Sequence, residues 1–367
     1  MSHRRVVALV VFCGLLLSAI ALSQQSTPKA EQKSDQPPRF TSGVNEVILP
    51  VTVTDDKGKF VSNLEAKDFR VLDEGRPQRI NFFSHSEKQP IVVGFLIDQS
   101  NASKIHWSKY QESILELVWH LLPGDKRYTG YLISYSNTAD ILVNTTWDQD
   151  KITDKVRKMK PGGGSALFDA VYLACTRRDL VKGEPYEPRR VIVIVGDGHD
   201  TASTHTINEV LELAQRNLVT VYGLSTMAFG FANEDQANLE RLARETGGHV
   251  EYPLNSLYKN VSGYLSNPSD DGNYALTVGV GGYAAEISAG ITRAVGGIGN
   301  EITTQYVLRY TPDVDDARQK VYRKITVDIP GLPNVKIFAR HGYYPNDVPA
   351  GAAAPAPVDP PKPTPKQ

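Results

Sequence analysis

Three polar segments carry the side chains that could do chemistry in this 367-residue chain. Residues 98–103 read Asp-Gln-Ser-Asn-Ala-Ser, residues 162–170 begin Gly-Gly-Gly-Ser, and residues 196–200 read Gly-Asp-Gly-His-Asp. Carboxylates and hydroxyls are hard oxygen ligands, which suit a divalent cation such as Mg²⁺ that keeps several of its waters. The sequence therefore predicts an all-oxygen metal site made by Asp98, Ser100, Ser165 and Asp197.

The elements that must position these residues are apolar runs typical of buried parallel strands. One run, 91–97, leads into the first polar segment; another, 191–195, leads into the third; and a third run covers 218–224. Strands alternate with helical patterns, which predicts an α/β fold: a doubly wound, mostly parallel, Rossmann-like sheet with helices on both faces. Ligands bind such sheets at the carboxyl ends of the strands, where the polar segments fall.

Spacing of three and four between apolar residues predicts a helix over 107–121, ended by Pro123 and Gly124. We expect further helices at 166–175, 207–215, 237–245 and 284–295, with the glycines of 296–299 ending the last one, and an edge hairpin formed by 128–134 and 141–143.

The two flanks of this region have β patterns. Neither exceeds about 50 residues, which is marginal for an independent core, so we expect them to pair into one small β unit into which the α/β domain is inserted. The expected organisation is a signal peptide at 1–23, a disordered leader at 24–40, a β-rich segment at 41–88, the α/β domain at 89–303, a second β-rich segment at 304–345 and a disordered Ala/Pro-rich tail at 346–367.

Composition describes an ordinary globular protein. Hydrophobic residues make up 41%, charged residues 22%, and the formal net charge is −1. These values argue against a disordered chain, a strongly basic nucleic-acid binder and a polytopic membrane protein. Cys175 lies in an apolar helical stretch, where we expect a buried and unreactive thiol.

The N-terminus has the pattern of a secretory signal. Arg4 and Arg5 precede an apolar run, and Ala21 and Ser23 are small residues at the −3 and −1 positions of a cleavage site before Gln24. The alternative is an uncleaved anchor, because a run of about 17 residues is near the short limit for spanning a bilayer. Cleavage would remove two arginines, change the net charge from −1 to −3, leave no membrane span and give a secreted or periplasmic protein.

The three polar segments, in this order, resemble the loops of the von Willebrand factor type A domain that form its metal-ion-dependent adhesion site. The resemblance covers about residues 89–300. With the flanking motifs at 68–75, 306–310 and 340–344, the chain resembles the secreted bacterial von Willebrand A-related family catalogued from acidobacteria.

The resemblance implies Mg²⁺ or Mn²⁺ bound by Asp98, Ser100, Ser165 and Asp197, with one position left open for an acidic side chain of a partner protein. Ser165 stands where the family usually has Thr, and both supply a hydroxyl. Ala102 stands where the family has a second Ser, and Ser103, one residue later, is expected to cap a helix. Weaker metal binding, a water in place of the hydroxyl, and a decayed site in a cell-envelope scaffolding module are therefore the open alternatives.

Enzyme functions find little support. The glycine run lacks the Gly-Lys-Ser/Thr of a phosphate loop, and no Gly-x-Ser-x-Gly or His-Glu-x-x-His motif occurs. His199 is the histidine nearest the candidate site, and we expect it to be an exposed loop residue rather than a general base. Asp200 is expected to bond within its own loop. The tyrosines at 258, 264 and 274 could contact a partner or pack in the core. We expect a protein partner and no nucleic acid, and the oligomeric state is left open.

Overall fold

The structure is a computed structural model that describes residues 46–85, 90–104, 107–177, 188–226, 234–253, 280–312 and 321–345. The expected signal peptide, leader and tail, and the tyrosines of 254–279, lie outside these residues. All described residues belong to one compact unit, Val44–Gln367. None of its described helices is long and apolar enough to cross a bilayer.

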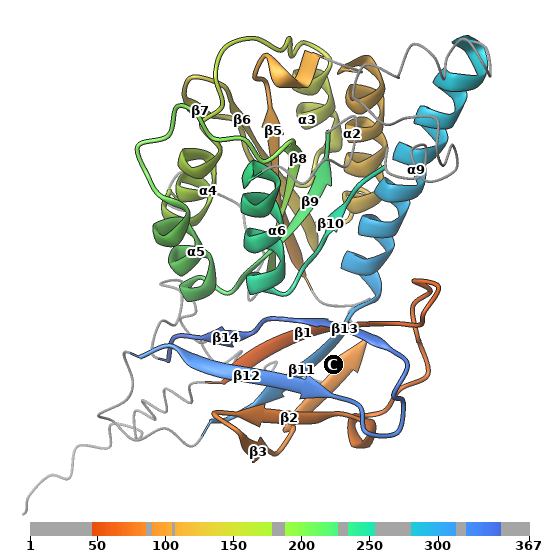
Figure 1. Cartoon of the computed structure of the whole chain (residues 1–367), viewed down its shortest axis with the longest axis vertical. Coiled ribbons are helices and arrows are strands. Elements are labelled where there is room, and N and C mark those ends of the chain that lie inside the picture. The colour runs from red at the N-terminus through yellow and green to blue at the C-terminus, as the bar shows by residue number, and fades with distance from the viewer. Residues whose placement is uncertain are drawn as a thin grey trace, which may run out of the picture. The chain divides into compact units, whose positions relative to one another are not determined.

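A six-stranded sheet forms the centre of the α/β part (Figure 1). Five of its strands are parallel, and the edge strand β7 is antiparallel to β6. The predicted strands and the edge hairpin are therefore confirmed. In spatial order the strands are β10 (Val250–Glu251), β9 (Val219–Ser225), β8 (Arg189–Gly196), β5 (Ile91–Asp98), β6 (Tyr128–Tyr135) and β7 (Ala139–Thr146).

Helices cover both faces of this sheet, because successive side chains of a strand point to opposite faces. On β5, Val93 and Phe95 belong to one apolar cluster, while Val92 and Leu96 belong to another. The first cluster takes in α2 (Trp107–Leu121), α3 (Gln149–Val156) and α9 (Val280–Thr304), and the second takes in α4 (Leu167–Thr176), α5 (Ile207–Arg216) and α6 (Glu234–Thr246). The predicted doubly wound fold class is confirmed.

The expectation that glycines 296–299 end the last helix is wrong, since α9 continues to Thr304. Its apolar stripe runs on through Ile298 and Ile302, both buried in the core, and this burial outweighs the low helix propensity of glycine. Gly299 packs against the His120 ring of α2 so closely that a Cβ at this position would overlap the ring. Helix α3 was not predicted; its first turn is capped by Asp148, whose side chain accepts from the Asp150 amide at 3.1 Å.

The two β-rich flanks do pair, and they form two four-stranded sheets. Each sheet mixes strands from both flanks, and a shared apolar cluster fills the space between the sheets. One sheet has the order β13 (Lys336–Ala339), β1 (Val47–Thr54), β11 (Tyr306–Tyr310), β4 (Phe82–His85); the other has β14 (Gly342–Tyr343), β12 (Arg323–Asp328), β2 (Arg70–Asp73), β3 (Arg76–Gln78).

A buried ion pair also joins the flanks. Asp73 at the end of β2 is fully buried and accepts from Arg323 Nε at 2.8 Å. Its second oxygen accepts from the hydroxyls of Tyr310, at 3.1 Å, and Tyr343, at 2.9 Å. A buried carboxylate is tolerated only when its charge and its lone pairs have partners, and here strands more than 200 residues away in sequence supply them.

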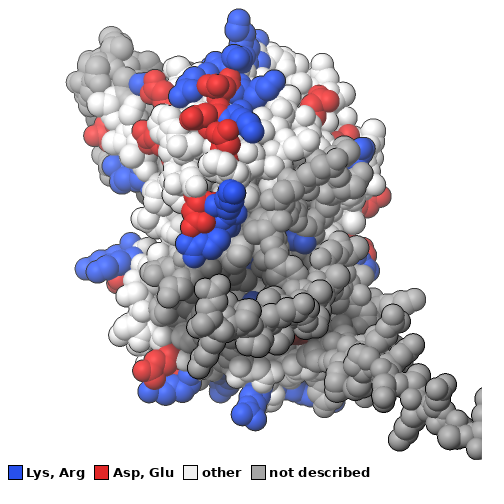
Figure 2. All heavy atoms as spheres, turned by 180° about the vertical axis from the view of Figure 1, so that it is seen from behind, with Lys and Arg blue, Asp and Glu red and all other residues white. Residues whose placement is uncertain are grey.

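Charges on the face shown in Figure 2 alternate in sign, with lysines and arginines next to acidic side chains. Ion pairs between residues one helical turn apart also join opposite charges: Lys109 with Glu112 in α2, and Arg157 with Asp154 at the end of α3. The described residues on this face therefore form no broad basic patch of the sort that holds a nucleic-acid backbone.

Candidate metal site at the carboxyl edge of the sheet

Asp98 and Asp197 lie at the carboxyl ends of adjacent parallel strands. Asp98 is the last residue of β5, and Asp197 directly follows β8, which pairs with β5 in register. Asp98 is 1% exposed and Asp197 is 7% exposed. Two carboxylates that sequence placed almost a hundred residues apart are therefore buried at one edge of the sheet.

The loop after β5 folds around the Asp98 carboxylate. Asp98 Oδ1 accepts from the Ser100 amide at 2.7 Å, and Asp98 Oδ2 accepts from the Ser100 hydroxyl at 3.1 Å. The Ser100 oxygen in turn accepts from the Ala102 amide at 3.2 Å. These short-range bonds fix Asp98 and Ser100 with their oxygens together, as short polar side chains do in turns.

Ser165 lies in the second polar segment and is tied to the third. Its hydroxyl donates to the His199 carbonyl at 2.7 Å, and its amide donates to Thr201 Oγ1 at 3.0 Å. The glycine run is also tied to the first loop, since the Asn101 amide donates to the Gly163 carbonyl at 3.0 Å. The three predicted segments therefore form one connected loop cluster at the carboxyl edge.

Electrostatics at this edge disfavour two bare carboxylates. Burial, with a smaller contribution from the charge of Asp197, raises the pKa of Asp98 to about 6, although the hydrogen bonds from Ser100 and the nearby hydroxyl of Ser103 act to lower it. The Tyr135 hydroxyl is buried in the same place, where burial and the charges of Asp98 and Asp197 hold its pKa well above the ordinary range. A cation placed among these groups would relieve the repulsion, so the donor set fits a hard divalent ion.

Ser103 does not cap a helix as expected. It lies inside a short 3₁₀ turn, η3 (Ala102–Lys104), whose backbone turns Ala102 outward to solvent and Ser103 inward. Ser103 is 1% exposed, and its Oγ has no hydrogen-bond partner among the described residues. It lies close enough to Asp98 to favour that residue's charged form. The chain thus places a buried hydroxyl beside Asp98 one residue later than the sequence pattern suggested.

His199 and Asp200 follow Asp197 in the third loop. The His199 amide donates to Asp197 Oδ1 at 3.0 Å, and His199 Nδ1 lies 3.1 Å from Asp197 Oδ2. The side chain is 37% exposed in its loop, and its ring lies against the Asp197 carboxylate. Asp200 bonds within its own loop as predicted: it accepts from the Ser203 amide at 3.1 Å and the Ser203 hydroxyl at 2.5 Å.

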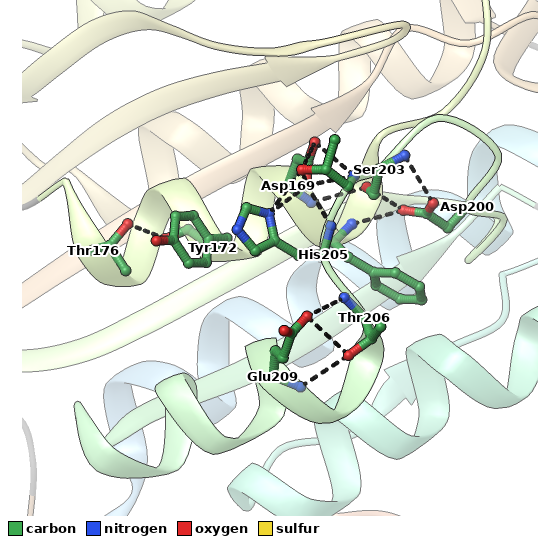
Figure 3. Close-up of polar contacts among 10 residues, drawn as sticks. Asp169, Tyr172, Thr176, Asp200, Ser203, His205, Thr206 and Glu209 are labelled. Carbon is green, nitrogen blue, oxygen red and sulfur yellow. Dashed lines mark hydrogen bonds and ion pairs between the residues drawn. The ribbon is translucent and has the colours of Figure 1, made fainter.

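Asp169, near the start of α4, positions the third loop, a role that the sequence analysis did not assign to it (Figure 3). It accepts from the amides of Thr204 and His205 at 3.0 and 3.1 Å, and from His205 Nδ1 at 2.6 Å. Burial would raise the pKa of Asp169, but these bonds and the histidine outweigh it and lower that pKa. The His205 ring stacks on Tyr172 of α4, with centroids 3.6 Å apart. Asp169 therefore joins the loop that carries Asp197 to the start of α4. The signal in the sequence was its place just after the glycine run, in Leu-Phe-Asp-Ala at 167–170.

Across the described part of the chain, no group of three or more His, Cys, Asp or Glu side chains lies close enough to share a metal ion. The candidate set contains only two carboxylates, and its other donors are hydroxyls. A site of this composition depends on Ser side chains rather than on a cluster of acids.

The α/β part has the von Willebrand factor type A fold. Residues 93–259 match the family model of the von Willebrand factor type A domain, a range that contains all four predicted ligands. No match was found among proteins of curated function.

Three solved structures illustrate what the chain is similar to. BatB from Bacteroides thetaiotaomicron is 17% identical, with a TM-score of 0.37 over 51% of this chain and 99% of that one. Proximal thread matrix protein 1 from the mussel byssus, with a zinc-occupied MIDAS motif, is 13% identical, with a TM-score of 0.37 over 46% of this chain and 42% of that one. A von Willebrand factor type A protein from Catenulispora acidiphila is 11% identical, with a TM-score of 0.40 over 83% of this chain and 64% of that one. Likenesses this distant carry no inference about function.

Proposed function

We propose that the protein is a metal-dependent protein-binding module that uses Mg²⁺ or Mn²⁺ at the carboxyl edge of its central sheet. The observation that carries this proposal is the burial of Asp98 and Asp197 together, with hydroxyls around them and a raised Asp98 pKa. Asp98 and Asp197 would supply the negative charge of the site. Ser100 and Ser165 would supply hydroxyl oxygens, and Ser103 would replace the hydroxyl that Ala102 lacks.

The partner would present an acidic side chain. Two carboxylates balance the charge of a divalent cation, so the preference for an acidic partner rests on the open coordination position, which a hard carboxylate oxygen fills well. The Ser100, Ser103 and Ser165 oxygens add no charge, so the site would not repel this carboxylate more strongly with a third hydroxyl. The proposed activity is binding rather than turnover, as the resemblance of the three loops to an adhesion site implies.

The finer assignment, also part of this proposal, is to the secreted bacterial von Willebrand A-related family. The signal-like N-terminus and the paired β flanks support it, and they favour a location outside the cytoplasm.

A second candidate function is a cell-envelope scaffold whose metal site has decayed, which the outward-facing Ala102 favours. Capture of partners from the native envelope separates the two. The purified protein is immobilised with Mg²⁺ or with a chelator, beside an Asp98→Asn variant. Metal-dependent function predicts that the same partner is lost with the chelator and with the variant. A partner retained under both conditions would support the scaffold instead.

A further inference from the structure

A cavity of about 560 Å³ lies between the end of α6 and strands β12 and β13 of the β unit. Its lining combines basic side chains with apolar ones. The basic side chains are Arg244, Lys324 and Arg340, with His341 beside them, and Tyr322 and Ile337 contribute to the apolar wall. A volume of this size fits a small organic molecule.

The site is distinct from the metal edge. Arg340 Nη2 donates to the carbonyl of Leu218 at 3.1 Å, and Leu218 directly precedes β9. The metal edge lies at the other, carboxyl ends of the parallel strands.

Arg340 is a buried cation that pairs with no carboxylate among the described residues. It is 3% exposed, and the bond to Leu218 is its one hydrogen bond within the described residues, where its Nε has no partner. Burial lowers its pKa to about 10. Arg323, on the neighbouring strand, is also buried but is paired with Asp73 at 2.7 Å. A buried charge is costly unless it is paired, and an anion bound in the cavity would supply the partner that Arg340 lacks among the described residues.

The other charges around the cavity reinforce this conclusion. Arg244 and Lys324 form no ion pair within the described residues, whereas Glu245 is already paired with Arg241 at 3.0 Å. Burial lowers the pKa of His341, and the charges of Arg244 and Lys324 lower it further, against an opposing effect of Glu245. With His341 neutral, the described lining of the cavity has three cations, Arg244, Lys324 and Arg340, and one carboxylate, Glu245. Its net charge is therefore +2.

The carbonyl groups at the C-terminal end of α6 do not neutralise the positive charge of the cavity. The final carbonyls of α6 would disfavour an anion if they were free. The Gly248 amide donates to the Ala243 carbonyl at 2.9 Å, and Thr246 Oγ1 donates to the Leu242 carbonyl at 2.7 Å. These carbonyls are therefore occupied, and the basic side chains dominate the cavity.

We infer that this cavity binds a small organic phosphate monoester, with the phosphate at Arg340, Arg244 and Lys324 and the organic part against Tyr322 and the aliphatic side chains of β12 and β13. A dianion matches the net charge of the lining. Arginine's fork of donors matches phosphate oxygens, and the aromatic and aliphatic wall matches an apolar body.

Calorimetry with phenyl phosphate, benzoate and benzyl alcohol at constant ionic strength tests this assignment on the full chain. We expect phenyl phosphate to bind with one site per chain, benzoate to bind at least about tenfold more weakly, and benzyl alcohol to give no heat. Benzoate binding as tightly as phenyl phosphate would overturn the assignment of a dianion, and no phenyl phosphate binding at millimolar concentration would overturn the site.

Two exposed residues allow a variant that keeps the fold. The double variant Arg244→Gln, Lys324→Gln should weaken phenyl phosphate binding by about tenfold or more. Lys158→Gln, which removes an exposed lysine next to α3, is the matched control and should leave it unchanged. Unchanged affinity in the double variant, with the same melting temperature as wild type, would place the phosphate elsewhere and overturn the proposal.

Discussion

The α-carbon of Gly247 lies directly against the backbone of Arg340. A Cβ added to Gly247 would come within 2.5 Å of the Arg340 nitrogen, and Gly247 has a φ of +92°. Both the close approach and the positive φ require glycine at this position. The end of α6 and the end of β13 therefore meet through backbone, beside the cavity that contains Arg340.

Gly247→Ala should destabilise the protein by about 2–3 kcal/mol, because the new methyl group meets backbone atoms and the backbone conformation becomes strained. Chemical denaturation measures this change. Gly331→Ala is the control, since Gly331 is exposed and has open space at its Cβ. Equal stability of the Gly247→Ala variant and wild type would show that this contact does not form.

Asp73→Asn should cost about 3–5 kcal/mol of unfolding free energy, because it leaves Arg323 buried without its counter-charge. Thermal and urea unfolding give the value. Asp56→Asn, in an exposed turn of the same β unit, should change stability by less than about 0.5 kcal/mol. A loss at Asp73 no larger than that at Asp56 would contradict the view that this pair joins the two flanks.

His249 gives stability a defined pH dependence. Burial alone would lower its pKa, but Glu251, at 3.1 Å, and Glu301, at 3.0 Å, outweigh burial and raise the pKa from 6.5 to about 10. Its contribution is therefore fully present below pH 6.5 and is lost as the pH rises toward 10. Across that interval the slope approaches about 1.4 kcal/mol per pH unit. His249→Gln should flatten urea-derived stability over this range; a wild-type slope kept by the variant would rule out this histidine as its source.

Ser103 and Ala102 form a matched pair for testing the ligand set. Ser103→Ala should weaken Mn²⁺ binding by about tenfold, because it removes the buried hydroxyl beside Asp98. Ala102→Ser should leave the affinity unchanged, because residue 102 faces solvent. The opposite pattern, in which only Ala102→Ser changes the affinity, would mean that the loop follows the usual family spacing.

The regular elements could be predicted from the sequence because their signals are local. Apolar runs and three-to-four spacing located the strands around Phe95 and Val193 and the helix containing Ile114. The course of α9 past Gly296 could not be predicted, because contacts of Ile298 and Ile302 with distant elements override the local preference of glycine.

At the candidate site, sequence order located Asp98, Ser100, Ser165 and Asp197 on loops that the structure brings together. The inward turn of Ser103 depends on the 3₁₀ conformation of η3, which no residue spacing encodes. The ion pair of His249 with Glu301 could not be predicted either, since Glu301 lies on α9, 52 positions later in the chain.

The central claim is that Asp98 and its neighbours hold a divalent cation. Calorimetric titration of Mn²⁺ and Mg²⁺ into the chelator-treated protein tests it most directly, with Asp98→Asn as the test variant. Asp140→Asn is the control, since Asp140 is an exposed carboxylate on β7, opposite Ser134 of β6. We predict one ion bound per chain in wild type and in Asp140→Asn, and no binding in folded Asp98→Asn. Absence of binding to folded wild-type protein at millimolar metal, or equal binding by Asp98→Asn, would contradict the proposed metal site.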